Sequence, residues 1–273
     1  MVKLMQIMPK IEQITSRENR RLVAARKVRD GRTDDLIFIE GKRLAAEAIR
    51  SKLEIVECFV AENFSDTELA KEICDTTYAV FELDTKLFES ISDTVQSQGI
   101  ILIAKRPVFD QNAFDLAVGS ARLPVVLFLK EINNPSNLGA ILRTAEAAGV
   151  TAVITSKSSA DVFSPKALRA AMGAGFRLSI WQNADFYDVL KWAGEKGMQT
   201  VAADISGDRS YLELDWRKPS LLIFGSEAHG LSEAELGNVD TKIVIPMENA
   251  VESLNIAVSA GIVLFEAKRQ LAA

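Results

Sequence analysis

Three polar segments in the second half of the sequence carry side chains suited to positioning a substrate and stabilising developing charge. Residues 133–139 are rich in asparagine and are followed by Arg143. Residues 225–232 combine glycines with Glu227, and residues 245–255 end in serine and asparagine side chains. Amide, carboxylate and guanidinium groups orient reacting groups by hydrogen bonding, and glycine lets the backbone approach a ligand closely. We interpret the three segments as parts of one site.

Each segment by itself also fits an ordinary helix cap. Asparagine and serine side chains, including those of Ser232 and Ser253, commonly cap helix starts. Capping does not explain Arg143, which stands among small and apolar residues of its predicted helix. Nor does it explain Asn255, which falls two residues into the predicted final helix. Because all three segments also follow apolar runs, we favour a functional site over three separate caps.

Several other kinds of site are not supported. The glycine motifs of dinucleotide and phosphate-binding loops are absent, and Gly173 and Gly175 follow a predicted helix, which indicates close helix packing. His229 is the only histidine and no nucleophilic-serine motif accompanies it, so a Ser-His-Asp hydrolase is not predicted. Cys58 and Cys74 are the only cysteines and lack metal-ligand spacing, so we predict neither a disulfide framework nor a metal site.

The elements that must hold the three segments are alternating strands and helices. Strands are predicted at 125–129, 152–155, 177–181, 199–203, 221–225 and 242–246, and helices from the 133–137 turn to Gly149 and at 164–174, 185–196 and 253–270. Continuous apolar runs indicate strands buried on both faces, which predicts a mainly parallel sheet with crossover helices. Ligands bind at the carboxyl ends of such strands. The three segments are therefore expected to meet at one edge of the sheet.

The first part of the sequence shows a similar but smaller pattern. A helix is predicted from a cap near Ser16 to Gly31, followed by strands and helices at 36–40, 42–51, 55–61, 66–74 and 100–104. Residues 106–123 show no strong period. A length of 273 residues favours two domains. We predict an N-terminal domain over 1–105, a linker over 106–123 and a C-terminal domain over 124–273.

Composition limits the class of protein. With 48% hydrophobic and 25% charged residues, the chain is of ordinary globular type. The apolar runs are far below the roughly 18 residues that span a bilayer, and no signal-peptide core begins the sequence. We therefore predict a cytoplasmic protein without a membrane partner.

Charge is unevenly distributed. The formal net charge is −5, yet the first 32 residues contain nine Lys and Arg residues against three acidic residues. This basic stretch is either a solvated helix face or an RNA-binding surface. Candidate RNA-binding residues are Arg17, Arg20, Arg21, Arg26 and Lys27.

The polar segments resemble the motifs of the SpoU (TrmH) branch of the SPOUT methyltransferases. The matching stretches are NLGAILRTA at 137–145, GSE with GLS within 225–232, IPM at 245–247, ESLNI at 252–256 and SPKALRA at 164–170. They occur in the family's order and spacing, and the resemblance covers residues 125–270. Asn134 is a departure, since relatives often carry Asp before the proline. ITSR at 14–17, IEG at 39–41 and QGI at 98–100 are similar to a small α/β RNA-binding domain of ribosomal-protein-like fold.

The resemblance implies properties that the residue patterns alone do not. It implies a C-terminal SPOUT domain of α/β fold with a deep trefoil knot, whereas ordinary topology rules predict an unknotted doubly wound sheet. It implies S-adenosyl-L-methionine as cofactor, bent into the knotted loops, and no metal. It also implies a homodimer through the C-terminal domain, with sites near the interface.

The resemblance also assigns roles to residues. Residues implied to contact the cofactor, in part through the backbone, are Gly225, Ser226, Ile245, Met247 and Leu254. The catalytic polar set is Asn137, Arg143, Glu227, Ser253 and Asn255. Arg143 is expected to hold a phosphate through two hydrogen bonds and stabilise the alkoxide, since an ordinary Arg pKa is too high for a free base. Asn137 and Glu227 would orient Arg143 and the ribose, and Ser253 and Asn255 would fix the loop and the substrate.

The implied activity is 2′-O-ribose methylation of RNA. The extra N-terminal domain favours ribosomal RNA of the 23S type over transfer RNA, and a tRNA 2′-O-methyltransferase is the nearest alternative. A second is a resistance methyltransferase acting on a drug-binding site of ribosomal RNA. A third is a non-catalytic RNA-binding or ribosome-assembly protein of the same fold, although the presence of all five polar residues favours an enzyme.

Overall fold

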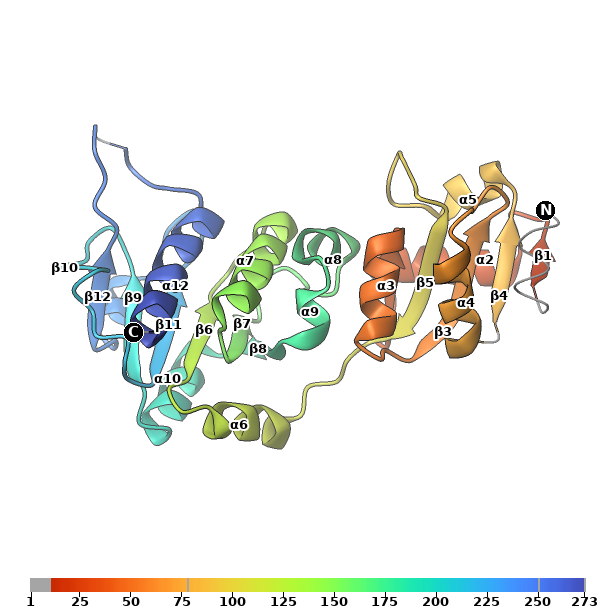
Figure 1. Ribbon diagram of the computed structural model, residues 1–273. Helices are drawn as coiled ribbons and strands as arrows, with labels where there is room; N and C mark the ends of the chain where they lie inside the picture. Colours follow the sequence, from red (N-terminus) through yellow and green to blue (C-terminus); the bar gives the residue numbers. More distant parts are fainter. Residues whose placement is uncertain (1–10, 78, 250, 273) are drawn as a thin grey trace. The chain divides into compact units, whose positions relative to one another are not determined.

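The computed structural model of the chain describes residues 11–77, 79–249 and 251–272. The chain divides into two compact units, which can be followed by colour in Figure 1. Unit 1 runs up to Val108 and also includes Phe163–Arg177, and unit 2 comprises Phe109–Val162 and the chain from Leu178 onward. Each unit is a β-sheet with helices on both faces. The predicted α/β fold is therefore confirmed.

The sheet of unit 1 has five strands in the order β1-β4-β3-β5-β2. They are β1 (Glu12–Ile14), β2 (Leu36–Glu40), β3 (Ile55–Ala61), β4 (Val80–Leu83) and β5 (Ile100–Lys105). β5 runs antiparallel to both its neighbours, and the other pairs are parallel. The sequence predicts β2 and β3 with these same bounds, because both are dense apolar runs.

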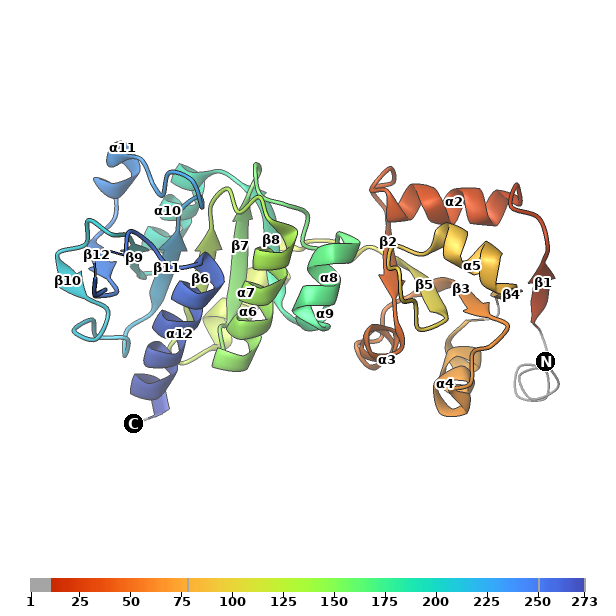
Figure 2. The same ribbon diagram turned by 90° about the horizontal axis from the view of Figure 1, so that it is seen from above.

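Four helices cover this sheet. They are α2 (Arg20–Arg29), α3 (Lys42–Arg50), α4 (Thr67–Thr76) and α5 (Thr85–Ile91). Figure 2 shows α2 and α5 on one face and α3 and α4 on the other. The core under α2 and α5 includes buried Leu22, Phe59 and Phe88. The sequence predicts that the first helix starts near Ser16, but it starts at Arg20 because Asn19 Oδ1 accepts a hydrogen bond from the Arg21 N–H at 2.9 Å.

Two short helices, α8 (Pro165–Ala171) and α9 (Ala174–Arg177), also belong to unit 1. Arg177 donates to Glu47 at 2.6 Å, and Arg169 forms an ion pair with Asp93 at 2.7 Å. A Cβ atom at Gly173 would lie 2.8 Å from Glu47 Cβ. Close packing is therefore the role of Gly173, as the sequence indicates, and the SPKALRA stretch attaches to unit 1.

Unit 2 has a seven-stranded sheet in the order β10-β12-β9-β11-β6-β7-β8, and every pair in it is parallel. The strands are β6 (Val125–Leu129), β7 (Ala152–Ser156), β8 (Ser179–Ala184), β9 (Gln199–Ala203), β10 (Arg209–Ser210), β11 (Ser220–Phe224) and β12 (Thr241–Val244). β6, β7 and β11 are buried along their whole length, which explains their continuous apolar sequences. The predicted parallel sheet is confirmed.

The helices of unit 2 form two layers. They are α6 (Gln111–Ser120), α7 (Pro135–Ala148), α10 (Phe186–Glu195), α11 (Glu233–Leu236) and α12 (Ile256–Ala272). α7 and α12 pack side by side on the face shown at the front of Figure 1. α6 and α10 contribute Phe114, Phe186 and Trp192 to the core on the opposite face. The helices thus leave the strand ends uncovered, and the loops of the site lie there.

Two elements of unit 2 differ from the sequence expectation. Residues 111–120, which lack a strong period, nevertheless form α6, because Phe114 and Val118 are buried and Asp110 caps the helix start. The final helix is expected from Ser253 but begins at Ile256. Asn255 Oδ1 accepts a hydrogen bond from the Ala257 N–H at 2.9 Å, so Asn255 is the cap in place of Ser253.

Candidate active site

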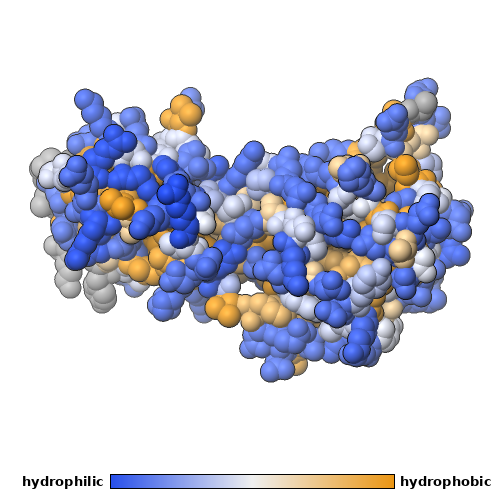
Figure 3. Space-filling model, turned by 180° about the vertical axis from the view of Figure 1, so that it is seen from behind, coloured by the Kyte–Doolittle hydropathy of each residue, from blue (hydrophilic) through white to orange (hydrophobic). Residues whose placement is uncertain are grey.

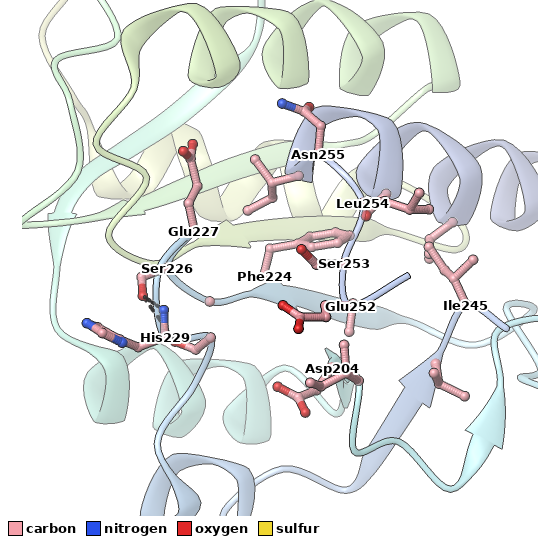
Figure 4. A pocket seen from close by; sticks show the side chains of 18 of the residues that line it. Asp204, Phe224, Ser226, Glu227, His229, Ile245, Glu252, Ser253, Leu254 and Asn255 are labelled. Carbon is pink, nitrogen blue, oxygen red and sulfur yellow. Dashed lines mark hydrogen bonds between the residues drawn. The ribbon is translucent and has the colours of Figure 1, made fainter. Parts of the chain in front are cut away.

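A cavity of about 600 Å³ lies in unit 2 at the carboxyl ends of β12, β9 and β11, which are neighbours in the sheet. Its walls are the loops that follow these three strands, together with Asn137 of α7 and the start of α12. Figure 4 shows this cavity with its lining side chains. Because the strands are parallel, their following loops meet at one edge of the sheet. The predicted meeting of the polar segments is thus observed.

The loop after β11 folds tightly back on itself. Ser226 and Gly230 exchange backbone hydrogen bonds of 3.1 and 2.9 Å. A Cβ atom at Gly225 would lie 2.3 Å from the carbonyl carbon of Gly230, a distance that no side chain permits. Ser226 Oγ also accepts the His229 N–H at 3.1 Å. Glycine is required here for the loop to approach its own backbone, and the backbone of residue 225 is left facing the cavity.

The far end of the same loop is held by a largely buried ion pair between Lys130 and Glu235. Glu235 accepts hydrogen bonds from both the N–H and the hydroxyl of Ser232 at 2.8 Å, and Lys130 Nζ lies 3.1 Å from Glu235. Burial alone would raise the pKa of Glu235, but the hydrogen bonds from Ser232 and Lys130 outweigh burial and lower it. For Lys130, burial alone would lower the pKa, but the hydrogen bonds that its ammonium donates to Glu131 and Glu235 outweigh burial and raise it. The loop is therefore anchored to the end of β6.

Helix α7 brings the first polar segment to the cavity. Asn134 Oδ1 caps the helix through the Ser136 N–H at 2.9 Å, and Pro135 occupies the first turn. Asn134 thus caps the helix, as asparagine commonly does. Asn137 follows in the first turn and lines the cavity.

Three side chains from three separate segments form one hydrogen-bonded set. Asn137 Nδ2 donates to Glu227 Oε1 at 2.8 Å, and Asn255 Nδ2 donates to Asn137 Oδ1 at 3.3 Å. The residues are 90 and 118 positions apart in the chain. Local capping cannot produce such contacts. The second oxygen of Glu227 accepts no hydrogen bond from a described residue, so it is available to a bound hydroxyl group.

The sequence-predicted residues fall into two groups. All five predicted cofactor contacts line the cavity: Gly225, Ser226, Ile245, Met247 and Leu254. Four of the predicted catalytic residues also line it: Asn137, Glu227, Ser253 and Asn255. Arg143 does not. Its side chain is exposed on α7 and makes no hydrogen bond or ion pair with the residues that the structure describes.

Sequence reasoning missed one wall of the cavity. Ala203 ends β9, Asp204 and Ile205 follow it, and all three line the cavity. No motif marks them. The signal would have been the strand order, because β9 lies between β12 and β11 and its carboxyl end therefore enters the site. Glu252, beside Ser253, also lines the cavity.

The predicted RNA-binding residues lie in unit 1, on and before α2. Arg17, Arg20 and Lys27 are exposed. Arg21 is instead paired with Glu57, with its guanidinium 4.4 Å from the ring centre of Phe81. Arg26 donates to the Arg17 carbonyl at 2.6 Å. Three of the five predicted RNA-binding residues are therefore exposed, and Lys3 and Lys10 lie outside the described residues.

The chain matches two family models. The model of the SpoU rRNA Methylase family matches residues 124–265. The model of the MRM3-like substrate binding domain matches residues 17–102. Within the described residues, no helix is long and apolar enough to cross a membrane, and no three His, Cys, Asp or Glu side chains are grouped as metal ligands.

Individual relatives are similar along most of their length. The 23S rRNA (guanosine(2553)-2′-O)-methyltransferase RlmP of Bacillus subtilis is 27% identical over 93% of this chain and 98% of its own. An uncharacterized tRNA/rRNA methyltransferase of Mycobacterium sp. (strain KMS) is 30% identical over 88% of this chain and 78% of its own. The crystal structure of the AdoMet-bound rRNA methyltransferase from Sinorhizobium meliloti superposes with a TM-score of 0.84 at 27% identity, covering 96% of this chain and 99% of that one.

Proposed function

Since the chain belongs to the SpoU rRNA methylase family, we propose that it transfers a methyl group from S-adenosyl-L-methionine to a ribose 2′-hydroxyl of ribosomal RNA of the 23S type. The observation that carries the proposal is the Asn137–Glu227–Asn255 set at the edge of the cavity. It places an acceptor and fixed amides beside a space of nucleoside size. RlmP, named for 23S rRNA, supports the choice of substrate.

The residues present fit the cofactor. A volume of about 600 Å³ is within the range of pockets for ligands of this size. Gly225, Ile245 and Leu254, for which the resemblance implies backbone contacts with the cofactor, line the cavity, and Phe224 and Val263 add apolar surface for a purine ring. When bound, the cofactor supplies a methyl group on a positively charged sulfur.

The chain's own residues would position and activate the hydroxyl. Glu227 has one carboxylate oxygen committed to Asn137 and one available to the ribose, and Asn255 holds Asn137 in place. Fixing the hydroxyl in line with the methyl group supplies a large part of the rate enhancement. Arg143 would bind the adjacent phosphate and stabilise the oxygen as it loses its proton.

We propose that the protein acts as a homodimer through unit 2. Val258 and Phe265 are 51% and 49% exposed and lie seven residues apart on α12, so they share one face of the helix. Exposed apolar surface of this kind is typical of protein interfaces. On the opposite face of the molecule, which Figure 3 shows from behind, the hydrophobic residues lie in small separate areas. We further propose that Arg143 of the second copy serves the cavity, because no Lys or Arg of its own chain is among the lining residues.

The trefoil knot belongs to the same proposal. Family membership supports it. A dimer is tested by light scattering: Phe265→Glu should yield the mass of a monomer, whereas Val95→Glu, at a fully exposed site of unit 1, should leave the mass unchanged.

The function is tested by mapping ribose methylation in total RNA from a strain that lacks this protein. Loss of one methyl group from 23S rRNA, restored by the wild-type gene, is the expected result. Loss from a transfer RNA would identify the alternative tRNA enzyme. Unchanged methylation in every RNA, with no transfer by the purified protein, would favour a non-catalytic RNA-binding protein.

A further inference from the structure

The residues that line the cavity carry an unbalanced charge. Three of them are carboxylates, Asp204, Glu227 and Glu252, and none is Lys or Arg. His229 also lines the cavity. Glu227 is committed in part to Asn137. The other two lie together on another side of the cavity from Glu227 and Asn255 in Figure 4. Two carboxylates thus face the cavity without a cationic partner among its lining residues.

Asp204 is held in place by one oxygen only. Its Oδ1 accepts hydrogen bonds from the Ser206 N–H at 2.8 Å and from the Ser206 hydroxyl at 2.7 Å. Its Oδ2 accepts none from a described residue, and lies 3.2 Å from where a Cβ atom of Gly230 would be. The carboxylate is therefore oriented by Ser206 and directed at the glycine loop, with one oxygen left for a ligand.

The proposed reaction changes the charge of the molecule in the cavity. S-adenosylmethionine carries a sulfonium, an ammonium and a carboxylate, for a net charge of +1. Loss of the methyl group leaves a neutral sulfide, so the product has a net charge of zero. A negative field from fixed carboxylates stabilises the first more than the second, because only the first carries the additional positive charge.

We infer, on the basis of the proposed function, that Asp204, with Glu252, makes the cavity selective for the positively charged cofactor over its demethylated product. Both carboxylates act on the sulfonium by charge, and Asp204 is the better oriented. The consequence is that product leaves more readily after transfer. Asp204 is thus a specificity-determining residue on the wall that the family motifs do not mark.

The experiment is calorimetric titration of the full-length protein with three ligands. They are S-adenosylmethionine, S-adenosylhomocysteine and sinefungin. In sinefungin a carbon that carries a protonated amine replaces the methylated sulfur and keeps the positive charge. Asp204→Asn retains an oxygen for Ser206 but removes the charge. It should weaken binding of both cationic ligands by roughly threefold to tenfold, the scale of one partly exposed charge pair, and leave S-adenosylhomocysteine within about twofold.

Glu252→Gln should act in the same direction, and the double variant should show the largest effect. Asp208→Asn is the matched control, because Asp208 is exposed in the same loop but does not line the cavity. Added salt should narrow the difference between cationic and neutral ligands in the wild type. A melting curve for each variant confirms that it is folded.

Two results would overturn the inference. An equal loss of affinity for all three ligands would mean that Asp204 shapes the site or binds the amino group that all three share. Unchanged affinities would mean that it has no role in binding. If the wild-type protein binds none of the three ligands, the proposed function itself fails, and this outcome is distinct from both.

Discussion

The two units share an α/β architecture but differ in the direction of their strands. In unit 2 all seven strands are parallel, so every strand ends at the same edge and three polar loops converge on one cavity. In unit 1 β5 runs against its neighbours, so loops divide between two edges, and the predicted RNA contacts lie on a helix surface instead. Parallel connection concentrates polar side chains in one place, which suits chemistry. A mixed sheet with an exposed basic helix suits contact with an extended RNA.

The largest loss of methyl transfer is expected from a substitution of Arg143 in unit 2. Arg143→Ala should lower methyl transfer by roughly 10² or more, the scale for loss of one preorganised charged group. Melting temperature and cofactor affinity should stay unchanged, because the side chain is exposed and lies outside the cavity lining. Single-turnover transfer of labelled methyl to RNA measures the effect.

Arg143→Lys should recover little activity, since lysine keeps the charge but loses the planar two-point geometry. Mixing Arg143→Ala with Asn137→Ala chains should restore part of the activity if each site uses side chains of both copies. Near-normal transfer by a folded Arg143→Ala protein would remove Arg143 from the mechanism.

Binding of the cofactor should protect unit 2 and leave unit 1 unchanged. At a hundredfold excess over its dissociation constant, it should stabilise the folded state by about 2.7 kcal/mol. Hydrogen exchange should slow in the loops after β9, β11 and β12, and stay unchanged in α2 of unit 1. Protection confined to unit 1, or none anywhere, would contradict the assignment of the cavity.

Unlike cofactor binding, which depends on unit 2, RNA binding should depend on the exposed basic residues of unit 1. Replacing Arg20 and Lys27 by Gln should weaken RNA binding about tenfold and flatten its dependence on salt by about 0.7 to 0.9 log units for each phosphate that the variant no longer binds. Cofactor affinity should be unaffected. The paired control, Lys191→Gln with Lys218→Gln, removes two exposed cations from unit 2. If the control weakens RNA binding as much, the RNA surface is not on α2.

The smallest effect is expected at the anchor of the β11 loop. Because the pKa of Glu235 is lowered in the folded protein, its contribution to stability is present above its unfolded pKa and is lost as pH falls through the folded pKa. Glu235→Gln should therefore destabilise unit 2 by about 1 kcal/mol at pH 7 and by less below about pH 4.

Urea unfolding at both pH values, with Glu233→Gln of the same helix as control, measures this difference. Lys130 behaves in the opposite sense, since its raised pKa makes its contribution fade only as the medium becomes strongly alkaline. An equal loss of stability at both pH values would show that the carboxylate charge is not what holds the loop.

The sequence predicts much of unit 2 because its signals are local. Continuous apolar runs such as 125–129 identify strands, and the motif residues Asn137, Glu227 and Asn255 are joined by hydrogen bonds. What it misses depends on distant contacts. Asp204 enters the site only because β9 lies between two strands that come later in the chain. The position of α6 rests on two buried apolar side chains, too few to produce a clear period.

The position of the Arg143 side chain and the start of α12 also could not be predicted from local sequence. A motif identifies residues but does not show on which face of a helix they lie or in which subunit they act. Arg143 belongs to a motif, yet it does not line the cavity of its own chain. The sequence places Asn255 inside a helix, where asparagine is unfavourable. In the structure it is the cap, and one side chain both begins the helix and holds Asn137.

In the turn between Gly225 and Gly230, the positions that fix the backbone differ from the positions whose side chains can vary. Its form is enforced by main-chain contact, so position 225 has almost no freedom to vary, whereas Ala228 and His229 at its tip are exposed. Descendants of this chain can therefore explore new side chains at the tip without altering the contour below it. The tip of this loop is therefore a suitable place for sequence variation, in evolution or in a directed library, because substitutions there leave the backbone of the turn unchanged.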